Sequence, residues 1–236
     1  MALNLKIDLY ADGADIGDMV AARDSGLVKG FTTNPTLMRK SGISDYEAFA
    51  RDALKAVGGL PISFEVFADE FEEMERQAKR IATWGDGVFV KIPITNTRGA
   101  SSINLIRRLS AAGVRLNITA MLTLDQVRCV VDAVDKNVPA IVSVFAGRIA
   151  DTGRDPVPLM TEAAGIVRKK PKAQLLWASP RELLNIFQAD ACGCHIITVT
   201  GDILKKLAMV GKSLDDLSLD TVKMFYNDAA AAGFRL

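Results

Sequence analysis

The heptapeptide Gly87-Val88-Phe89-Val90-Lys91-Ile92-Pro93 is an apolar run with a single charged residue, and it predicts a buried strand that ends at a proline. Burial of a lysine is costly because an apolar environment disfavours the charged ammonium form. An amine that is neutral for part of the time can attack a carbonyl carbon and form a Schiff base. Alternatively, the ammonium group of Lys91 reaches the surface along its aliphatic stem or pairs with a carboxylate.

The same alternation of apolar and helical segments runs along the whole chain. Eight alternations of strand and helix in about 200 residues favour a parallel (β/α)8 barrel, a TIM barrel, over a six-stranded open sheet. No Gly-x-Gly-x-x-Gly motif follows the first strand, which argues against dinucleotide binding. The expected strands cover residues 5–11, 30–33, 62–67, 88–92, 114–119, 140–145, 174–178 and 195–199, and clear helical patterns cover 69–83, 101–112, 123–134 and 156–169.

The chain contains no low-complexity or Pro/Gly/Ser-rich linker, so we expect one barrel domain over residues 1–236. Residues 214–236 then form a C-terminal helical extension, with a helix over 218–231. Its apolar residues Leu219, Val222, Phe225 and Tyr226 need a surface to cover, either on this barrel or on a neighbouring subunit.

Composition excludes several classes of protein. A formal net charge of +1 gives no overall field that would attract nucleic acid or an acidic membrane surface. No apolar run approaches the roughly 18 residues of a membrane span, and the first residues lack a signal-peptide pattern, so we expect a cytoplasmic protein. His195 is the only histidine, and its neighbours Cys192 and Cys194 have the wrong spacing for zinc. We expect these three residues to pack at the start of a strand.

Polar residues gather where the predicted strands end. Catalytic groups of (β/α)8 barrels lie at the C-terminal ends of the strands. Each such residue alone has a structural explanation, such as a turn or a helix cap, but their joint presence favours a reactive Lys91. Seven of the eight predicted strands contribute to this set, which consists of Asp12, Asn34, Glu65, Lys91, Asn117 with Thr119, Ser143 with Arg148, and Ser179 with Arg181.

These residue types fit the cleavage of a sugar. An imine between Lys91 and a ketose carbonyl would accept the electron pair of an adjacent carbon–carbon bond, and a carboxylate, Asp12 or Glu65, would take the hydroxyl proton. Amides such as those of Asn34 and Asn117 both donate and accept hydrogen bonds, which suits a polyhydroxylated substrate. Arginine and hydroxyl groups late in the barrel are typical of a phosphate site.

The sequence resembles the transaldolase family, in particular its short branch that includes fructose-6-phosphate aldolases. The likeness covers nearly the whole chain. Its motifs are Ala11-Asp12-Gly13-Ala14-Asp15, Thr32-Thr33-Asn34-Pro35-Thr36-Leu37, Phe64-Glu65-Val66, Val90-Lys91-Ile92-Pro93, Asn117-Ile118-Thr119, the segment from Val142 to Ile149, and Ala178-Ser179-Pro180-Arg181.

The resemblance implies roles for these residues, in a reaction that needs neither metal nor cofactor. Lys91 matches the Schiff-base lysine, Asp12 the proton-transfer aspartate, and Glu65 with Thr119 the pair that positions a catalytic water. It also implies phosphorylated sugar substrates and a homo-oligomer, such as a pentamer or decamer, in which the C-terminal helix reaches a neighbour. Residues matching contacts to substrate hydroxyls are Asn34, Asn117 and Ser143, and those matching the phosphate-binding group are Arg148, Ser179 and Arg181.

Three positions separate transfer from simple aldol cleavage. Relatives acting as fructose-6-phosphate aldolases carry glutamine, a leucine-like residue and tyrosine where this chain has Glu65, Asn117 and Phe145. We therefore expect a transaldolase that moves a dihydroxyacetone unit from fructose 6-phosphate or sedoheptulose 7-phosphate to an aldose phosphate, with Phe145 against the substrate. The alternatives are an aldolase that releases free dihydroxyacetone and a non-catalytic sugar-phosphate-binding barrel. Arg98, in the loop 95–102, is either a second anion contact or a solvent-facing arginine.

Overall fold

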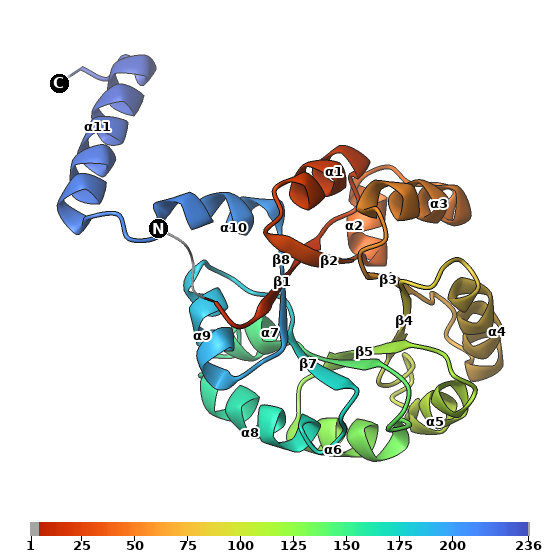
Figure 1. The fold of residues 1–236 in the computed structure, drawn as a ribbon. Coiled ribbons are helices and arrows are strands. Elements are labelled where there is room, and N and C mark those ends of the chain that lie inside the picture. Colours follow the sequence, from red (N-terminus) through yellow and green to blue (C-terminus); the bar gives the residue numbers. More distant parts are fainter. Residues whose placement is uncertain (1–4, 236) are drawn as a thin grey trace.

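The computed structural model describes residues 5–235, and its centre is a closed barrel of eight parallel strands (Figure 1). Each strand pairs with the next one in the chain, and β8 pairs with β1. The predicted TIM barrel is therefore confirmed, and the open six-stranded sheet is wrong. The strands are β1 (Asp8–Asp12), β2 (Val28–Thr32), β3 (Ile62–Glu65), β4 (Val88–Pro93), β5 (Leu116–Met121), β6 (Ala140–Val144), β7 (Ala173–Trp177) and β8 (Ile196–Val199).

Helices surround the barrel on the outside (Figure 1). Several begin at a side chain that accepts a backbone N–H, which satisfies a donor that the first turn leaves free. At α6 the side chains of Thr123 and Gln126 form a reciprocal capping box. The helices are α1 (Ile16–Asp24), α2 (Pro35–Lys40), α3 (Tyr46–Val57), α4 (Phe71–Ala82), α5 (Ile103–Ala111), α6 (Leu124–Ala133), α7 (Ala146–Ala150), α8 (Val157–Val167), α9 (Leu184–Cys192), α10 (Gly201–Lys205), the 3-10 helix Lys206–Met209, and α11 (Leu214–Ala232).

The apolar side chains of the strands form two groups, one outside the barrel and one inside it. Those that face outward pack against the helices in one large core. A smaller cluster contains Tyr10, Phe89, Ile141, Leu176 and Ile196. Residues two positions apart point to the same face of a strand. The residues that follow this cluster by two positions therefore also face into the barrel, and they form a second layer nearer the C-terminal ends of the strands. The small cluster therefore forms an apolar floor inside the barrel, below the C-terminal ends of the strands.

The last helix, α11, stands apart from the barrel (Figure 1). It begins at Leu214, four residues before the predicted start, because Ser213 caps it by accepting the N–H of Asp216. None of its residues is buried, and Phe225 and Tyr226 are 63% and 74% exposed. The predicted domain 1–236 and extension 214–236 include residues 1–4 and 236, which lie outside the described residues. Among the described helices, none combines the length and apolar character that crossing a membrane would require.

Candidate active site

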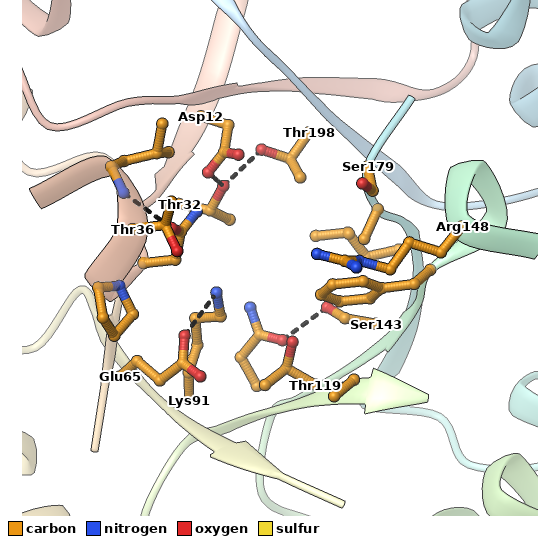
Figure 2. A pocket seen from close by; sticks show the side chains of 18 residues that line it. Asp12, Thr32, Thr36, Glu65, Lys91, Thr119, Ser143, Arg148, Ser179 and Thr198 are labelled. Carbon is orange, nitrogen blue, oxygen red and sulfur yellow. Dashed lines mark hydrogen bonds and ion pairs between the residues drawn. The ribbon is translucent and has the colours of Figure 1, made fainter. Parts of the chain in front are cut away.

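A cavity of about 470 Å³ opens above the apolar floor, where the strands end (Figure 2). Most of the side chains that the sequence singles out contribute to its wall. The lining residues are Asp12, Thr32, Asn34, Pro35, Thr36, Leu37, Glu65, Lys91, Asn117, Thr119, Ala120, Ser143, Phe145, Arg148, Leu176, Ala178, Ser179 and Thr198.

Lys91 lies in the middle of β4 and is 6% exposed. Its Nζ donates a hydrogen bond to the carbonyl oxygen of Thr33 at 2.9 Å and lies 3.2 Å from Oε2 of Glu65, its neighbour on β3. The buried amine is thus held at two points and directed into the cavity (Figure 2). A carboxylate partner compensates part of the cost of burying an ammonium group, and it can also accept the proton of that group.

Asp12 is held by hydroxyl groups of two other strands. Thr32 donates from Oγ1 to Asp12 Oδ1 at 2.7 Å, and the Oγ1 atoms of Thr32 and Thr198 are 2.5 Å apart. Because the single hydroxyl proton of Thr32 goes to Asp12, Thr198 is the donor to Thr32. Burial raises the pKa of Asp12, against the opposing effects of Lys91 and of the Thr32 hydrogen bond. A carboxyl group whose pKa is raised in this way takes up a proton more readily than an exposed aspartate does, which is a useful property in an acid–base group.

A second polar network lies on the neighbouring strands. Ser143 donates from Oγ to Asn117 Oδ1 at 2.6 Å, and Asn117 donates from Nδ2 to Ser63 Oγ at 3.0 Å. All three residues are almost fully buried. The network fixes the orientation of the Asn117 amide, which retains one N–H for a molecule in the cavity.

Asn34 and Thr119 complete the polar wall near Lys91. The side chain of Asn34 caps α2 by accepting the N–H of Leu37 at 3.0 Å, so its amide nitrogen remains for a ligand. Thr119 Oγ1 is buried and has no hydrogen-bond partner within residues 5–235. Buried hydroxyls are normally hydrogen-bonded, so this one is available to a molecule in the cavity.

Arg148 and Ser179 lie across the cavity from Lys91 and Glu65 (Figure 2). The guanidinium of Arg148 stacks on the ring of Phe145, with its central carbon 5.7 Å from the ring centre. This contact points the positive charge into the cavity, where it can attract an anion.

Two other arginines do not line the cavity. Arg181 pairs with Asp151, and Arg98 pairs with Asp69 and Glu70. The structure therefore brings together every predicted site residue except Arg181, and it places Arg98 in a surface ion-pair cluster.

Three further residues hold the site and are not among the residues predicted from the sequence. Thr32 and Thr198 orient Asp12, and Ser63 orients Asn117. The signal for Thr198 is the alternation of β8, because Thr198 follows the inward-facing Ile196 by two positions. Ser63 gives the same kind of signal, since it lies two positions before Glu65 and therefore on the same face of β3.

The cysteines near the only histidine have a packing role. Cys192 and Cys194 are both buried in the large core, on either side of the glycine that ends α9. His195 accepts the backbone N–H of Leu175 through Nδ1 at 3.0 Å. Burial raises the pKa of Cys194 to about 12, so this thiol stays protonated at neutral pH.

Comparison with known proteins identifies the family. Residues 9–236 match the family model described as Transaldolase/Fructose-6-phosphate aldolase. A protein of Dehalococcoides mccartyi named "Probable transaldolase" is 34% identical over 200 residues, which cover 84% of this chain and 89% of that relative. A "Probable transaldolase" of Thermoplasma volcanium is 32% identical over 89% of this chain and 92% of its own length. Another, from Streptococcus equi subsp. equi, is 31% identical over 94% of this chain and 97% of its own length. The chain thus belongs to the transaldolase/fructose-6-phosphate aldolase family.

Proposed function

We propose that this protein is a class I transaldolase, which transfers a dihydroxyacetone unit from a ketose phosphate to an aldose phosphate. Fructose 6-phosphate and sedoheptulose 7-phosphate are the proposed donors. The observation that carries this proposal is the buried amine of Lys91, which faces the cavity with Glu65 Oε2 3.2 Å away. Membership of the family and the names of the relatives support it.

Lys91 acts first in the proposed reaction. It passes a proton to a neighbouring carboxylate, for which Glu65 is the nearest, and its neutral amine attacks the ketone carbon of the sugar. Loss of the ketone oxygen as water leaves an iminium ion on Nζ. Glu65 and the free hydroxyl of Thr119 hold this water, and they hold the water that hydrolyses the iminium at the end.

Asp12 performs the proton transfer that accompanies bond cleavage. It removes the proton from the hydroxyl group beside the bond that breaks, and the electron pair of that bond moves into the iminium to give an enamine. The aldose phosphate leaves. In the second half-reaction the enamine attacks the aldehyde of an acceptor, and Asp12 returns the proton to the new hydroxyl. Its raised pKa and its hydrogen bond from Thr32 support this role.

The remaining polar groups orient the sugar. The oriented amide of Asn117, the amide of Asn34 and the hydroxyl of Ser143 contact the hydroxyl groups of the substrate. Arg148 and Ser179 lie at the far end of the cavity, where they bind the phosphate.

Transfer, rather than release of dihydroxyacetone, is favoured by Phe145. Its ring lines the cavity and supports Arg148, and it has no acidic proton that it could give to the enamine. The enamine therefore persists until an acceptor aldehyde arrives.

We also propose a cytoplasmic homo-oligomer in which α11 contacts a neighbouring copy. The apolar side chains of this helix are exposed, including Leu219, Val222 and Phe225, and an exposed apolar face is typical of an interface. Sedimentation analysis tests this proposal, because replacing Val222 and Phe225 by aspartate should dissociate the oligomer. A wild-type protein that sediments as a monomer would contradict it.

Trapping with borohydride tests the chemistry. The wild-type protein is incubated with fructose 6-phosphate, reduced and digested, and we expect a stable mass increase on the peptide that contains Lys91. The Lys91→Met variant should show neither labelling nor activity. The matched control is Lys170→Met, because Lys170 also donates to a backbone carbonyl, that of Val134, but lies outside the cavity lining. Reversible binding without labelling in the wild type would favour a sugar-phosphate-binding protein.

Product analysis separates transferase from aldolase. With glyceraldehyde 3-phosphate or erythrose 4-phosphate as acceptor, a transaldolase forms a new ketose phosphate. Without an acceptor it should release little free dihydroxyacetone. Rapid release without an acceptor would identify an aldolase instead.

A further inference from the structure

Arg148 and Arg181 lie near the same end of the cavity but differ in what surrounds their charges. Arg148 lines the cavity, and no carboxylate within residues 5–235 forms an ion pair with it. Arg181 lies outside the lining and is paired with Asp151, which follows the last residue of α7. Only one of the two guanidinium groups therefore faces the cavity without an ion-pair partner, although Asp151 also interacts with Arg148 at longer range.

The hydrogen-bonding capacity of Arg181 is almost completely used by the protein. Its Nε donates to Asp151 Oδ1 at 2.8 Å and its Nη2 to Asp151 Oδ2, which is the bidentate geometry that arginine and carboxylate favour. Its Nη1 donates to the backbone oxygen of Ser179 at 3.1 Å and to Ser179 Oγ at 3.0 Å. These bonds leave one of the five N–H groups of the guanidinium. The arginine also lowers the pKa of Asp151, so both partners are charged at neutral pH.

Ser179 needs such support because of its backbone conformation. Its φ angle is +60°, in the left-handed region that residues with a side chain rarely adopt. Such a conformation persists only where surrounding contacts fix it. The backbone oxygen of Ser179 lies against Gly147 in α7, so closely that a Cβ atom at position 147 would be 1.5 Å from it. Arg181 bonds to this same oxygen and to the hydroxyl of the same residue.

We infer that Arg181 is a positioning residue, which joins the turn 178–181 to α7 through Asp151 and holds the hydroxyl of Ser179 toward the phosphate of the substrate. The phosphate is then bound by one guanidinium group, that of Arg148. Because Ser179 Oγ accepts from Arg181, its own proton is free to be donated to a phosphate oxygen. This inference rests on the proposed function for the identity of the anion, and it departs from the sequence prediction that Arg181 contacts the substrate.

The variant Asp151→Asn distinguishes this arrangement from direct binding. If Arg181 positions Ser179, loss of the ion pair loosens the turn and weakens binding of the phosphate. If Arg181 is itself a phosphate ligand, removing Asp151 frees its guanidinium, and binding stays the same or becomes tighter. The two roles therefore predict opposite results for one substitution.

The experiment measures the Kd of inorganic phosphate by calorimetry and the KM for fructose 6-phosphate. The proteins are the wild type, Asp151→Asn, Arg181→Gln and the double variant. We expect each single variant to raise both constants about tenfold, as for loss of one hydrogen bond to a charged group. The double variant should be no worse than either single variant, because both remove the same interaction. Tighter or unchanged phosphate binding in Asp151→Asn, or additive effects in the double variant, would overturn the inference.

A second measurement separates positioning from general damage to the fold. Labelling of Lys91 by dihydroxyacetone and borohydride needs no phosphate site, so it should be unchanged in all variants. Loss of labelling in the variants alone would show a structural defect and would count against the inference. The matched control is Arg128→Gln, which removes ion pairs with Asp125 and Glu162 on the outside of the barrel. The side chains of Arg128 and Glu162 are 47% and 54% exposed, close to the 44% and 51% of Arg181 and Asp151.

Failure of the proposed function would be recognised independently. An absence of labelling in the wild-type protein would argue against the Schiff-base reaction, whereas the phosphate titrations would still report on Arg181. Failure of phosphate to bind to the wild type would overturn the inference itself.

Discussion

The hydroxyl oxygens of Thr32 and Thr198 are 2.5 Å apart, so the last strand of the barrel supports Asp12, the proposed acid–base group, on the first. Thr198 donates to Thr32, and Thr32 donates to Asp12. A hydrogen bond that is polarised by another in this way is stronger than an isolated one. The environment of Asp12 thus depends on a residue that it does not contact directly.

We predict that Thr198→Val lowers kcat/KM about tenfold, the effect expected for loss of one hydrogen bond in a charged network. A weaker hydrogen bond from Thr32 stabilises the ionised carboxylate less, so the pKa of Asp12 should rise further. The acidic limb of the pH–rate profile should therefore move to higher pH. Thr198→Ser keeps the hydroxyl and should restore the wild-type profile. An unchanged profile in Thr198→Val would contradict the relay.

Asp12→Asn should abolish activity but stabilise the folded protein at neutral pH. The pKa of Asp12 is raised above 3.8, chiefly by burial, so the folded state holds this proton more tightly than the unfolded state. The contribution of Asp12 to stability is then greatest below about pH 3.8 and is lost as the pH rises through the folded pKa. Urea unfolding at several pH values should show the variant gaining stability over the wild type as the pH rises above about 4. A constant difference across this range would refute the raised pKa.

Phe145→Tyr should shift the products from transfer toward release. A tyrosine hydroxyl in the cavity could protonate the enamine and liberate free dihydroxyacetone, whereas phenylalanine has no such proton. We expect the ratio of release to transfer to rise about tenfold, measured by product analysis with and without an acceptor. Phe145→Leu is the control, because it also changes the packing against Arg148 but adds no hydroxyl. Equal release in both variants would assign the effect to packing.

Gly147→Ala should destabilise the protein, because the added Cβ would overlap the backbone oxygen of Ser179. Backbone cannot move aside as a flexible side chain can, so we expect a loss of about 3 kcal/mol in the free energy of unfolding. Urea unfolding measures it. Gly165→Ala is the control, since no atom lies within 4 Å of a Cβ at that helical position. Similar stability of both variants would show that the backbone of the turn 178–181 can shift at little cost to accommodate the added Cβ.

The sequence was sufficient to predict the barrel because buried parallel strands are continuous apolar runs, and eight of them alternate with helices. The predicted limits of a strand are less accurate where hydrogen bonds to a distant part of the chain determine its first residue. β1 was expected from Leu5 but begins at Asp8, because the N–H groups of Lys6 and Ile7 bond to Asp190 near the end of α9. A partner more than 180 residues away gives no local signal.

The site was predictable where a polar residue interrupts an apolar strand, as Lys91 and Asn117 do. The site is not predictable where a side chain is turned toward or away from the cavity by a partner that is distant in sequence. Arg181 follows strand β7 at the rim, as a ligand would, but Asp151, 30 residues earlier, draws it away from the cavity. Thr198 gives only a weak signal, because a lone threonine in an apolar strand resembles an ordinary β-branched core residue.

Closure of the ring between β8 and β1 has a consequence for biosynthesis. A ribosome that has released only the first half of the chain has already supplied both the amine on β4 and the carboxylate on β1. The threonine that completes the support of that carboxylate comes from the last strand to be translated. Nascent or truncated chains that lack this final segment should therefore carry Lys91, the proposed nucleophile, without full support of Asp12, so we expect activity only from the whole barrel.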